Sequence, residues 1–332
     1  MNTQTVNGVE IIRGLDIEEY HKSPILSHTK IHSWIENSPE WWKARFVDGQ
    51  REEKEAEHFV VGRALDCLMF DGKDAFADCF VTSPATYPAV RKATKAEIAA
   101  GWPAEITEQK KWILSANYCK EWEETARAEG KSVVTSDQMR MIHAEAAAIA
   151  RNKFAREVLR ADGAEYQVTL RWQIDGIWFQ ARPDIINFKN QTFDDLKTTR
   201  SLDTVAKHYF FMGYDIQTGL IMDAMSRIFG TPPARSRHIY VDKSFYPTCV
   251  VQEVYGPIAG PSNGEYGLAR AVKIAREIEA CRTKGVFERP QREILPLVPP
   301  EWIQRKITAG EELHSGDFMA TDDAAETLER SM

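Results

Sequence analysis

The spacing of apolar residues changes along the chain. In the first half, apolar positions recur every three to four residues, which is typical of helices with one buried face. From residue 164 they alternate with polar positions, which is typical of half-buried strands. The predicted helices cover residues 30–46, 55–71, 136–160, 203–229 and 266–284. The predicted strands cover residues 166–172, 177–188, 191–198, 238–242 and 248–255.

Turn residues indicate how these strands pair. Asp175-Gly176 and Lys189-Asn190 each lie between two strand-like runs, which favours hairpins and antiparallel pairing. The segment 83–97 is rich in Pro, Ser, Thr and basic residues, and we expect it to be an exposed loop. The order of the elements predicts an α/β fold with a central mixed sheet flanked by helices.

The same order predicts one domain over residues 1–300. Its amino-terminal part, residues 1–160, is expected to be helical, and residues 161–290 are expected to form the α/β core. Residues 301–332 have an acidic end and are expected to be a partly mobile tail.

Composition narrows the class of protein. Of the 332 residues, 43% are hydrophobic and 27% charged, as in a soluble globular protein, and no stretch is apolar enough for a membrane span. The five cysteines are widely separated, which indicates free thiols in a reducing cytoplasm rather than a disulfide framework or a zinc ribbon. The net charge of −7 argues against a protein that coats nucleic acid by charge alone. It permits an enzyme with an acidic metal site and a local basic groove.

Carboxylates and a lysine recur at short spacing on two neighbouring predicted strands. Pro183-Asp184 lies on one strand and Asp195-Leu196-Lys197 on the next. Antiparallel pairing brings Asp184 and Asp195 together, and two such carboxylates repel unless a cation lies between them. Hard oxygen ligands suit Mg²⁺ or Mn²⁺. Lys197 points to the same face as Asp195, so its ammonium can orient or help to deprotonate a metal-bound water. These groups together suffice for phosphodiester hydrolysis.

The pattern is short, and the alternative is a surface hairpin with an ordinary Asp–Lys pair. Its context favours a site, because both pieces fall on adjacent predicted strands and a long helix follows. That helix carries Tyr214 and Gln217. This stretch resembles the fourth motif of the PD-(D/E)xK nucleases, in which a glutamine on the following helix braces the site. On its own, Gln217 can equally be a polar residue on a helix face.

Longer stretches resemble the nuclease domain of the phage RecE (exodeoxyribonuclease VIII) family, over about residues 18–290. They are SPILSHTKIHSWIENSPEWWKAR, GRALDCLMF, ARPDIINFKNQTFDDLKTTRSLD and GYDIQTGLIMDAM. The resemblance implies a PD-(D/E)xK, restriction-endonuclease-like core. It implies a Mg²⁺-dependent exonuclease that degrades one strand of double-stranded DNA, usually from the 5′ end. It further implies a homo-oligomeric ring and a partner in phage recombination, a single-strand annealing protein of the RecT type.

The resemblance also suggests roles for single residues. The carbonyl of Leu196 would complete the metal coordination, and Gln217 and Tyr214 would hold the lysine or the DNA end. One position departs from the family pattern, because Asp66 stands where that family has a histidine. Aspartate also binds hard metals, so Asp66 is a candidate ligand, and the alternative is a charge on the helix surface. Glu165 is a weaker candidate, for which a solvated charge is the alternative.

Two rival functions remain open on the sequence. One is another nuclease of the same superfamily, either an endonuclease or a CRISPR-associated iron–sulfur exonuclease, although the scattered cysteines speak against such a cluster. The other is a non-catalytic DNA-binding protein that kept the fold. The joint presence of Asp184, Asp195 and Lys197 speaks against this second alternative.

Overall fold

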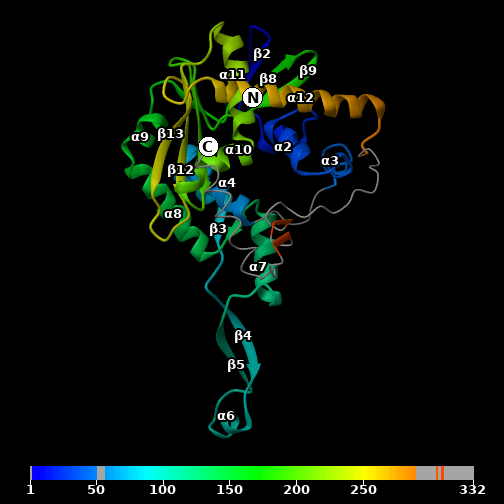
Figure 1. Ribbon diagram of the computed structural model, residues 1–332. Helices are drawn as coiled ribbons and strands as arrows, with labels where there is room; N and C mark the ends of the chain where they lie inside the picture. Colours follow the sequence, from blue (N-terminus) through cyan, green and yellow to red (C-terminus); the bar gives the residue numbers. More distant parts are fainter. Residues whose placement is uncertain (1, 51–56, 289–303, 306–307, 310–332) are drawn as a thin grey trace. The chain divides into compact units, whose positions relative to one another are not determined.

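The computed structural model describes residues 2–50, 57–288, 304–305 and 308–309, apart from the side chains of residues 57–59 (Figure 1). The chain divides into two compact units, residues 1–288 and 289–332, and the candidate site lies wholly in the first. The tail expected over residues 301–332 lies almost entirely outside the described residues. None of the described helices combines the length and the apolar character needed to cross a membrane.

Helices and strands alternate along the first unit. The strands are β1 (Asn2–Val6), β2 (Val9–Arg13), β3 (Phe80–Thr82), β4 (Thr86–Lys92), β5 (Glu105–Lys111), β6 (Ser132–Val134), β7 (Ala164–Tyr166), β8 (Thr169–Ile174), β9 (Ile177–Ala181), β10 (Ile185–Asn187), β11 (Thr192–Thr199), β12 (Arg235–Asp242) and β13 (Cys249–Tyr255). The helices are α1 (Ile17–Lys22), α2 (His28–Glu36), α3 (Pro39–Phe46), α4 (Glu57–Phe70), α5 (Gly72–Cys79), α6 (Lys95–Ala99), α7 (Asn117–Ala128), α8 (Ser136–Arg151), α9 (Lys153–Leu159), the 3-10 turn η1 (Leu202–Thr204), α10 (Val205–Phe211), α11 (Tyr214–Phe229) and α12 (Ser262–Lys284).

A five-stranded mixed sheet, in the order β13-β12-β11-β10-β7, lies at the centre of the fold. Strands β11 and β12 run parallel, and the other neighbours are antiparallel. The sheet residues Ile185, Leu196 and Ile239 are buried in one core cluster with Ile149 of α8 and Val158 of α9. The predicted α/β fold, a mixed sheet flanked by helices, is confirmed.

A second sheet, antiparallel and in the order β1-β2-β8-β9, was not predicted. Two of the predicted strands are each divided between the two sheets. Gln167 has a left-handed conformation, with φ 51°, between β7 and β8. Pro183, which has no N–H for a strand ladder, lies between β9 and β10. Asp184 therefore lies directly before a strand rather than in the middle of one. The predicted turn at Asp175-Gly176 is confirmed, with positive φ at both residues.

Three predicted long helices are also divided, each at a local signal. The helix expected over residues 136–160 becomes α8 and α9, because Asn152 ends the first helix and caps the second. The helix expected over residues 30–46 becomes α2 and α3, because Ser38 caps the second helix and Pro39 begins it. The helix expected over residues 203–229 becomes η1, α10 and α11, because Gly213 adopts φ 66° before α11. The break at Gly213 sets where α11, with two of the candidate residues, begins.

Helix α12 holds α11 in place through backbone contact. A Cβ atom on Gly267 would lie 1.8 Å from the carbonyl oxygen of Asp215, so only glycine fits there. The Asp215 side chain is buried and accepts a hydrogen bond of 2.7 Å from Nη1 of Arg270 on α12. The first turn of α11 is thus fixed by its contacts with α12.

The segment expected to be a loop over residues 83–97 contains a strand instead. Strand β4 pairs along its whole length with β5, and the short helix α6 lies between them. The loop prediction was wrong because proline, threonine and basic residues obscure an alternation of covered and exposed positions in β4. This hairpin begins just after β3 and points away from the five-stranded sheet (Figure 1). We refer to residues 84–112 as the arm.

Candidate active site

Asp184 and Asp195 face each other and hold each other's neighbouring backbone. In the antiparallel pairing of β10 with β11, Ile185 lies opposite Asp194, so the preceding residue lies opposite Asp195. Oδ1 of Asp195 accepts a hydrogen bond of 3.1 Å from the backbone N–H of Asp184. Oδ2 of Asp184 accepts one of 2.8 Å from the backbone N–H of Leu196. These bonds fix the orientation of both carboxylates.

Lys197 lies on the same side of β11 as Asp195. Its Nζ is 3.8 Å from Oδ1 of Asp195 and 5.0 Å from the centre of the Tyr214 ring at the start of α11. The lysine side chain is 15% exposed. Burial by itself lowers the pKa of Lys197, but Asp195 and Asp184 raise it above its ordinary value. The ammonium therefore stays protonated at neutral pH, which suits charge stabilisation better than proton abstraction.

The two facing carboxylates differ in their affinity for protons. Burial, followed by the charge of Asp195, raises the pKa of Asp184 well above its ordinary value. Burial also tends to raise the pKa of Asp195, but Lys197 leads the interactions that lower it below the ordinary value. Asp195 is thus the carboxylate that stays ionised, and Asp184 is the one whose ionised form is destabilised. A cation between them would stabilise the ionised form of Asp184.

His238 lies directly behind this pair on β12. The parallel register places it beside Asp195, and the side chain is fully buried. Nδ1 is 3.0 Å from the hydroxyl of Tyr240, whereas Nε2 has no hydrogen-bond partner among the described residues and lies 3.8 Å from Oδ2 of Asp195. Burial lowers the pKa of His238 to about 3, so the imidazole is neutral near pH 7. At that pH the contact is not an ion pair, and Lys197 is the cation that keeps Asp195 ionised.

A pocket of about 510 Å³ opens beside the carboxylates. Asp66 of α4, Asp184 and Gln217 of α11 all line it, although they come from separate parts of the sequence. Burial raises the pKa of Asp66, Lys197 lowers it, and the net direction is upward. The structure therefore brings these three candidate residues to one cavity, whereas Asp195 and Lys197 are not among the residues that line it.

Two residues that the sequence analysis missed also line this pocket. Arg182 donates to the carbonyl of Leu15 and to Oε1 of Gln167, so its guanidinium is held in the wall next to Asp184. His28 contacts the carbonyl of Met212 through Nε2 at 3.1 Å, and burial lowers its pKa to about 4. Arg182 immediately precedes the Pro-Asp pair, a signal that was available. His28 has no comparable local signal.

Glu165 lies elsewhere. Its carboxylate pairs with the guanidinium of Arg13 on β2, through Nε and, at 3.0 Å, through Nη2. Glu165 is not among the residues that line the pocket. The ion pair links the two sheets and gives this residue a structural role.

The donor set fits a hard divalent cation. Among the described residues, no three His, Cys, Asp or Glu side chains are close enough together to hold a metal ion by themselves. The available oxygens are the Asp184 and Asp195 carboxylates and the Leu196 carbonyl, and the Asp66 carboxylate lines the same pocket as Asp184. Mg²⁺ usually keeps several water ligands and takes only one or two carboxylates from a protein, so this sparse oxygen set matches its demands.

Comparison with solved structures yields distant likenesses. A protein from Eubacterium rectale described as a "Putative exonuclease" is 13% identical, with a TM-score of 0.49, over 85% of this chain and 97% of that one. A phage-related exonuclease from Haemophilus somnus is 14% identical, with a TM-score of 0.28, over 58% of this chain and 89% of that one. Both TM-scores lie below 0.5. No protein with a curated description matches the chain.

A family model gives a firmer assignment. The model described as a PDDEXK-like domain of unknown function (DUF3799) matches residues 27–251. That range includes Asp66, both motif carboxylates, Lys197 and the helix with Gln217. It covers well over half of the chain. The chain therefore belongs to this family of PDDEXK-like domains.

Proposed function

We propose that this chain is a metal-dependent deoxyribonuclease that hydrolyses phosphodiester bonds of double-stranded DNA from an end. The observation that carries the proposal is the braced pair Asp184 and Asp195, with the protonated Lys197 beside it and an open pocket in front. A buried carboxylate pair destabilises a fold unless it serves a cation. The family assignment supports the nuclease class, since PDDEXK names this set of residues.

Each residue of the candidate site has its own role in the proposed reaction. Asp184, Asp195, the Leu196 carbonyl and Asp66 would hold Mg²⁺, with Mn²⁺ as the second candidate. When bound, the cation would lower the pKa of a coordinated water and stabilise negative charge on the phosphate. Lys197 holds a positive charge at the reacting phosphate and orients the water. Tyr214 positions the lysine through its ring, and Gln217 contacts the DNA end in the pocket.

The finer assignment follows the RecE resemblance. It makes the enzyme a 5′-to-3′ exonuclease of phage-type recombination, acting as a homo-oligomeric ring with a single-strand annealing protein. The pocket supports end recognition, because Arg182 and Asp66 line the same cavity as Asp184.

Digestion of labelled DNA tests the proposal. Linear duplex with a 5′ or a 3′ label, carrying either a 5′-phosphate or a 5′-hydroxyl, is incubated with Mg²⁺ beside covalently closed circular duplex. We expect mononucleotides from the 5′ end of the linear substrate and no cleavage of the circle. Lys197→Ala should lower the rate by more than about 100-fold with unchanged DNA binding, whereas Lys207→Ala, an exposed lysine on α10, should not.

Three results would contradict it. Cleavage of the circle would make the enzyme an endonuclease. Full activity of Lys197→Ala would place the site elsewhere. Absence of cleavage with Mg²⁺ and Mn²⁺, together with normal DNA binding, would identify a non-catalytic member of the family.

A further inference from the structure

The arm is a two-stranded ribbon that receives no third strand among the described residues. Isolated two-stranded hairpins are marginally stable in water, so a ribbon of this kind needs support from its own side chains. At its root, Trp112 donates a backbone hydrogen bond to Ala85, and Tyr87 stacks on Tyr118 of α7. The root is thus attached to α7, and the outer part depends on polar contacts.

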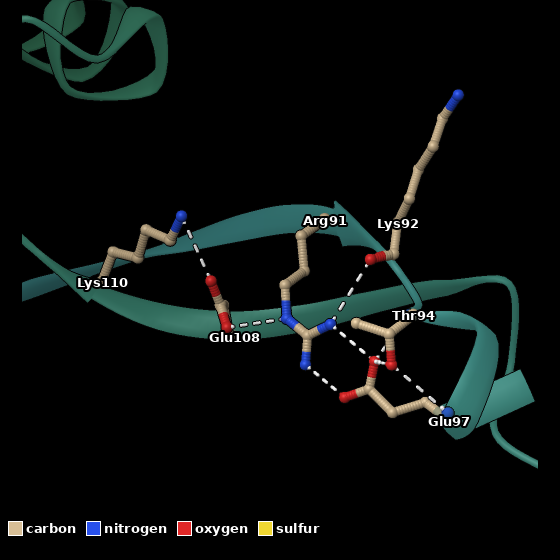
Figure 2. Close-up of polar contacts among 6 residues, drawn as sticks. All are labelled: Arg91, Lys92, Thr94, Glu97, Glu108 and Lys110. Atoms are coloured by element: carbon tan, nitrogen blue, oxygen red, sulfur yellow. Dashed lines mark hydrogen bonds and ion pairs between the residues drawn. The ribbon is translucent and has the colours of Figure 1, made fainter. Parts of the chain in front are cut away.

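One face of the arm is internally neutral (Figure 2). The guanidinium of Arg91 binds Glu97 of α6 at 2.7 Å and Glu108 of β5 at 3.1 Å, and Lys110 binds Glu108 at 3.1 Å. Thr94 caps α6 reciprocally with Glu97 and so ties the tip to the same network. Two cations and two carboxylates satisfy each other here, and none is left for a partner.

The other charges of the arm are three lysines and one glutamate. Lys92 and Lys111 lie on the opposite face of the ribbon, and Lys95 lies in α6; all three are exposed. Within the described part of the chain, no ion pair or hydrogen bond engages the ammonium group of any of them. Figure 2 shows the Lys92 side chain pointing away from the network. Glu105, opposite Lys92, is the one carboxylate on that side. The arm therefore has an excess of free positive charge, although the chain as a whole has a net charge of −7.

The arm begins at the wall of the candidate active site. It follows β3 directly, and the chain returns through α7 to β6, which pairs with β3 in parallel. Phe80 of β3 and Ser132 of β6 both line the pocket that contains Asp184. The arm is therefore attached to strands that contribute to the pocket lining.

We propose that the arm binds the phosphate backbone of the duplex beyond the end held in the pocket, an inference that rests on the proposed nuclease function. Seven-residue strands extend for roughly 23 Å, or about seven base pairs. A two-stranded ribbon has the width that the DNA major groove admits. The lysines supply positive charge outside the pocket, and the neutral network keeps the ribbon folded without using them.

The salt dependence of DNA binding tests the arm. Both proteins in this test carry Lys197→Ala, so that the DNA is not cleaved. One has the native arm, and the other also carries Lys92→Ala, Lys95→Ala and Lys111→Ala. Fluorescence anisotropy measures the binding of each to a 20-base-pair duplex. Each lost phosphate contact should reduce the slope of log K against log salt by about 0.9, so the slope should fall by almost three. Replacing the same three lysines with arginine should restore it.

A matched control removes three lysines from other helices, Lys153→Ala, Lys273→Ala and Lys284→Ala, and should leave the slope unchanged. An unchanged slope in the arm variant, or an equal fall in the control, overturns the proposal. An unchanged slope with altered sedimentation would instead assign the arm to contacts between copies of the chain.

A second readout separates this proposal from the nuclease function. The arm variant with Lys197 intact should hydrolyse the p-nitrophenyl ester of thymidine 5′-phosphate at the wild-type rate, because that substrate is too small to reach the arm. Failure of the wild type to hydrolyse the ester or DNA would overturn the nuclease function alone, since the slope is measured without turnover.

Discussion

His238 presents Nε2 to Oδ2 of Asp195 across 3.8 Å, and no polar atom of the described residues forms a hydrogen bond with that nitrogen. The tautomer of His238 depends on the hydrogen bond between Nδ1 and the Tyr240 hydroxyl. If the Tyr240 hydroxyl donates to Nδ1, the proton lies on Nε2 and faces the carboxylate, which is attractive; the reverse arrangement points a lone pair at a negative charge. His238 thereby orients Asp195 without touching a substrate. Such supporting contacts commonly change metal affinity by 10- to 100-fold.

We therefore expect His238→Ala to raise the Mg²⁺ concentration needed for half-maximal cleavage by at least about 10-fold. The rate at saturating Mg²⁺ should fall much less, because the residue acts through Asp195. His238→Gln retains an N–H donor near Nε2 and should recover most of the affinity. A purely structural role would instead give both variants the same loss of stability and the same Mg²⁺ dependence as wild type.

In the absence of metal, the ionised Asp184 side chain lowers the free energy of unfolding. Its pKa is raised by burial and by Asp195, so the native state binds a proton more tightly than the unfolded state does. Stability consequently falls as the pH rises above the unfolded value, and Asp184→Asn removes that loss. We expect Asp184→Asn to melt above wild type at pH 8 in EDTA while cleaving DNA more than about 100-fold more slowly.

Mg²⁺ should reverse the order of the melting temperatures of wild type and Asp184→Asn. Mg²⁺ binds the native state alone, so it should raise the melting temperature of wild type and leave that of Asp184→Asn almost unchanged. Calorimetric melting of both proteins with EDTA and with Mg²⁺ gives the four values needed. Equal Mg²⁺ stabilisation of the two would show that Asp184 is not a ligand.

Asp194, next to the candidate ligand Asp195, gives a matched contrast. Its carboxylate points to the other face of β11 and accepts three hydrogen bonds from Arg237, two from the guanidinium at 2.8 Å and one from the backbone at 2.9 Å. Asp194→Asn should cost about 2 kcal/mol of unfolding free energy, because it leaves a half-buried guanidinium without its counter-charge. Urea titration measures this loss. The Mg²⁺ dependence of ester hydrolysis should match wild type, and a shift there would mean that the strand face of Asp194 also shapes the site.

Local sequence was sufficient to predict that the central candidate residues lie close together. Asp184, Asp195 and Lys197 lie within fourteen residues of chain, and a short turn brings their strands together, so pattern and geometry coincide. The division of the helices was also encoded locally, at Ser38-Pro39 and at Gly213. The prediction missed these breaks because the helical spacing of apolar residues continues across them.

Long-range pairing explains what could not be predicted. His238 reaches Asp195 only through the parallel register of β11 and β12, across 43 positions of sequence. The second sheet arises because Gln167 and Pro183 redirect two strands, and neither residue signals which sheet the strand then joins. Asp66 was singled out through a resemblance, and its place on the pocket wall depends on how α4 packs.

Glu145 provides a test of the fold apart from the site. It lies on α8, fully buried, and neither carboxylate oxygen has a hydrogen-bond partner in the part of the chain that the structure describes. Burial raises its pKa from the usual 4.5 to about 7, against a smaller lowering by Lys243. Because the native pKa exceeds the unfolded one, the carboxyl group is neutral in both states below about pH 4.5 and costs nothing there. The cost grows as the pH rises towards 7 and is complete above it.

Glu145→Gln should therefore stabilise the protein in a pH-dependent way. A shift of this size corresponds to about 3 kcal/mol, which is the gain expected at pH 8, and at pH 5 most of the gain should vanish. Urea unfolding of wild type and variant at both pH values measures it. Glu157→Gln, an exposed position on α9, serves as the control and should show no pH-dependent difference. If Glu145→Gln changes the unfolding free energy equally at pH 5 and pH 8, the carboxylate has a partner in solution and its burial is not the cause of the shift.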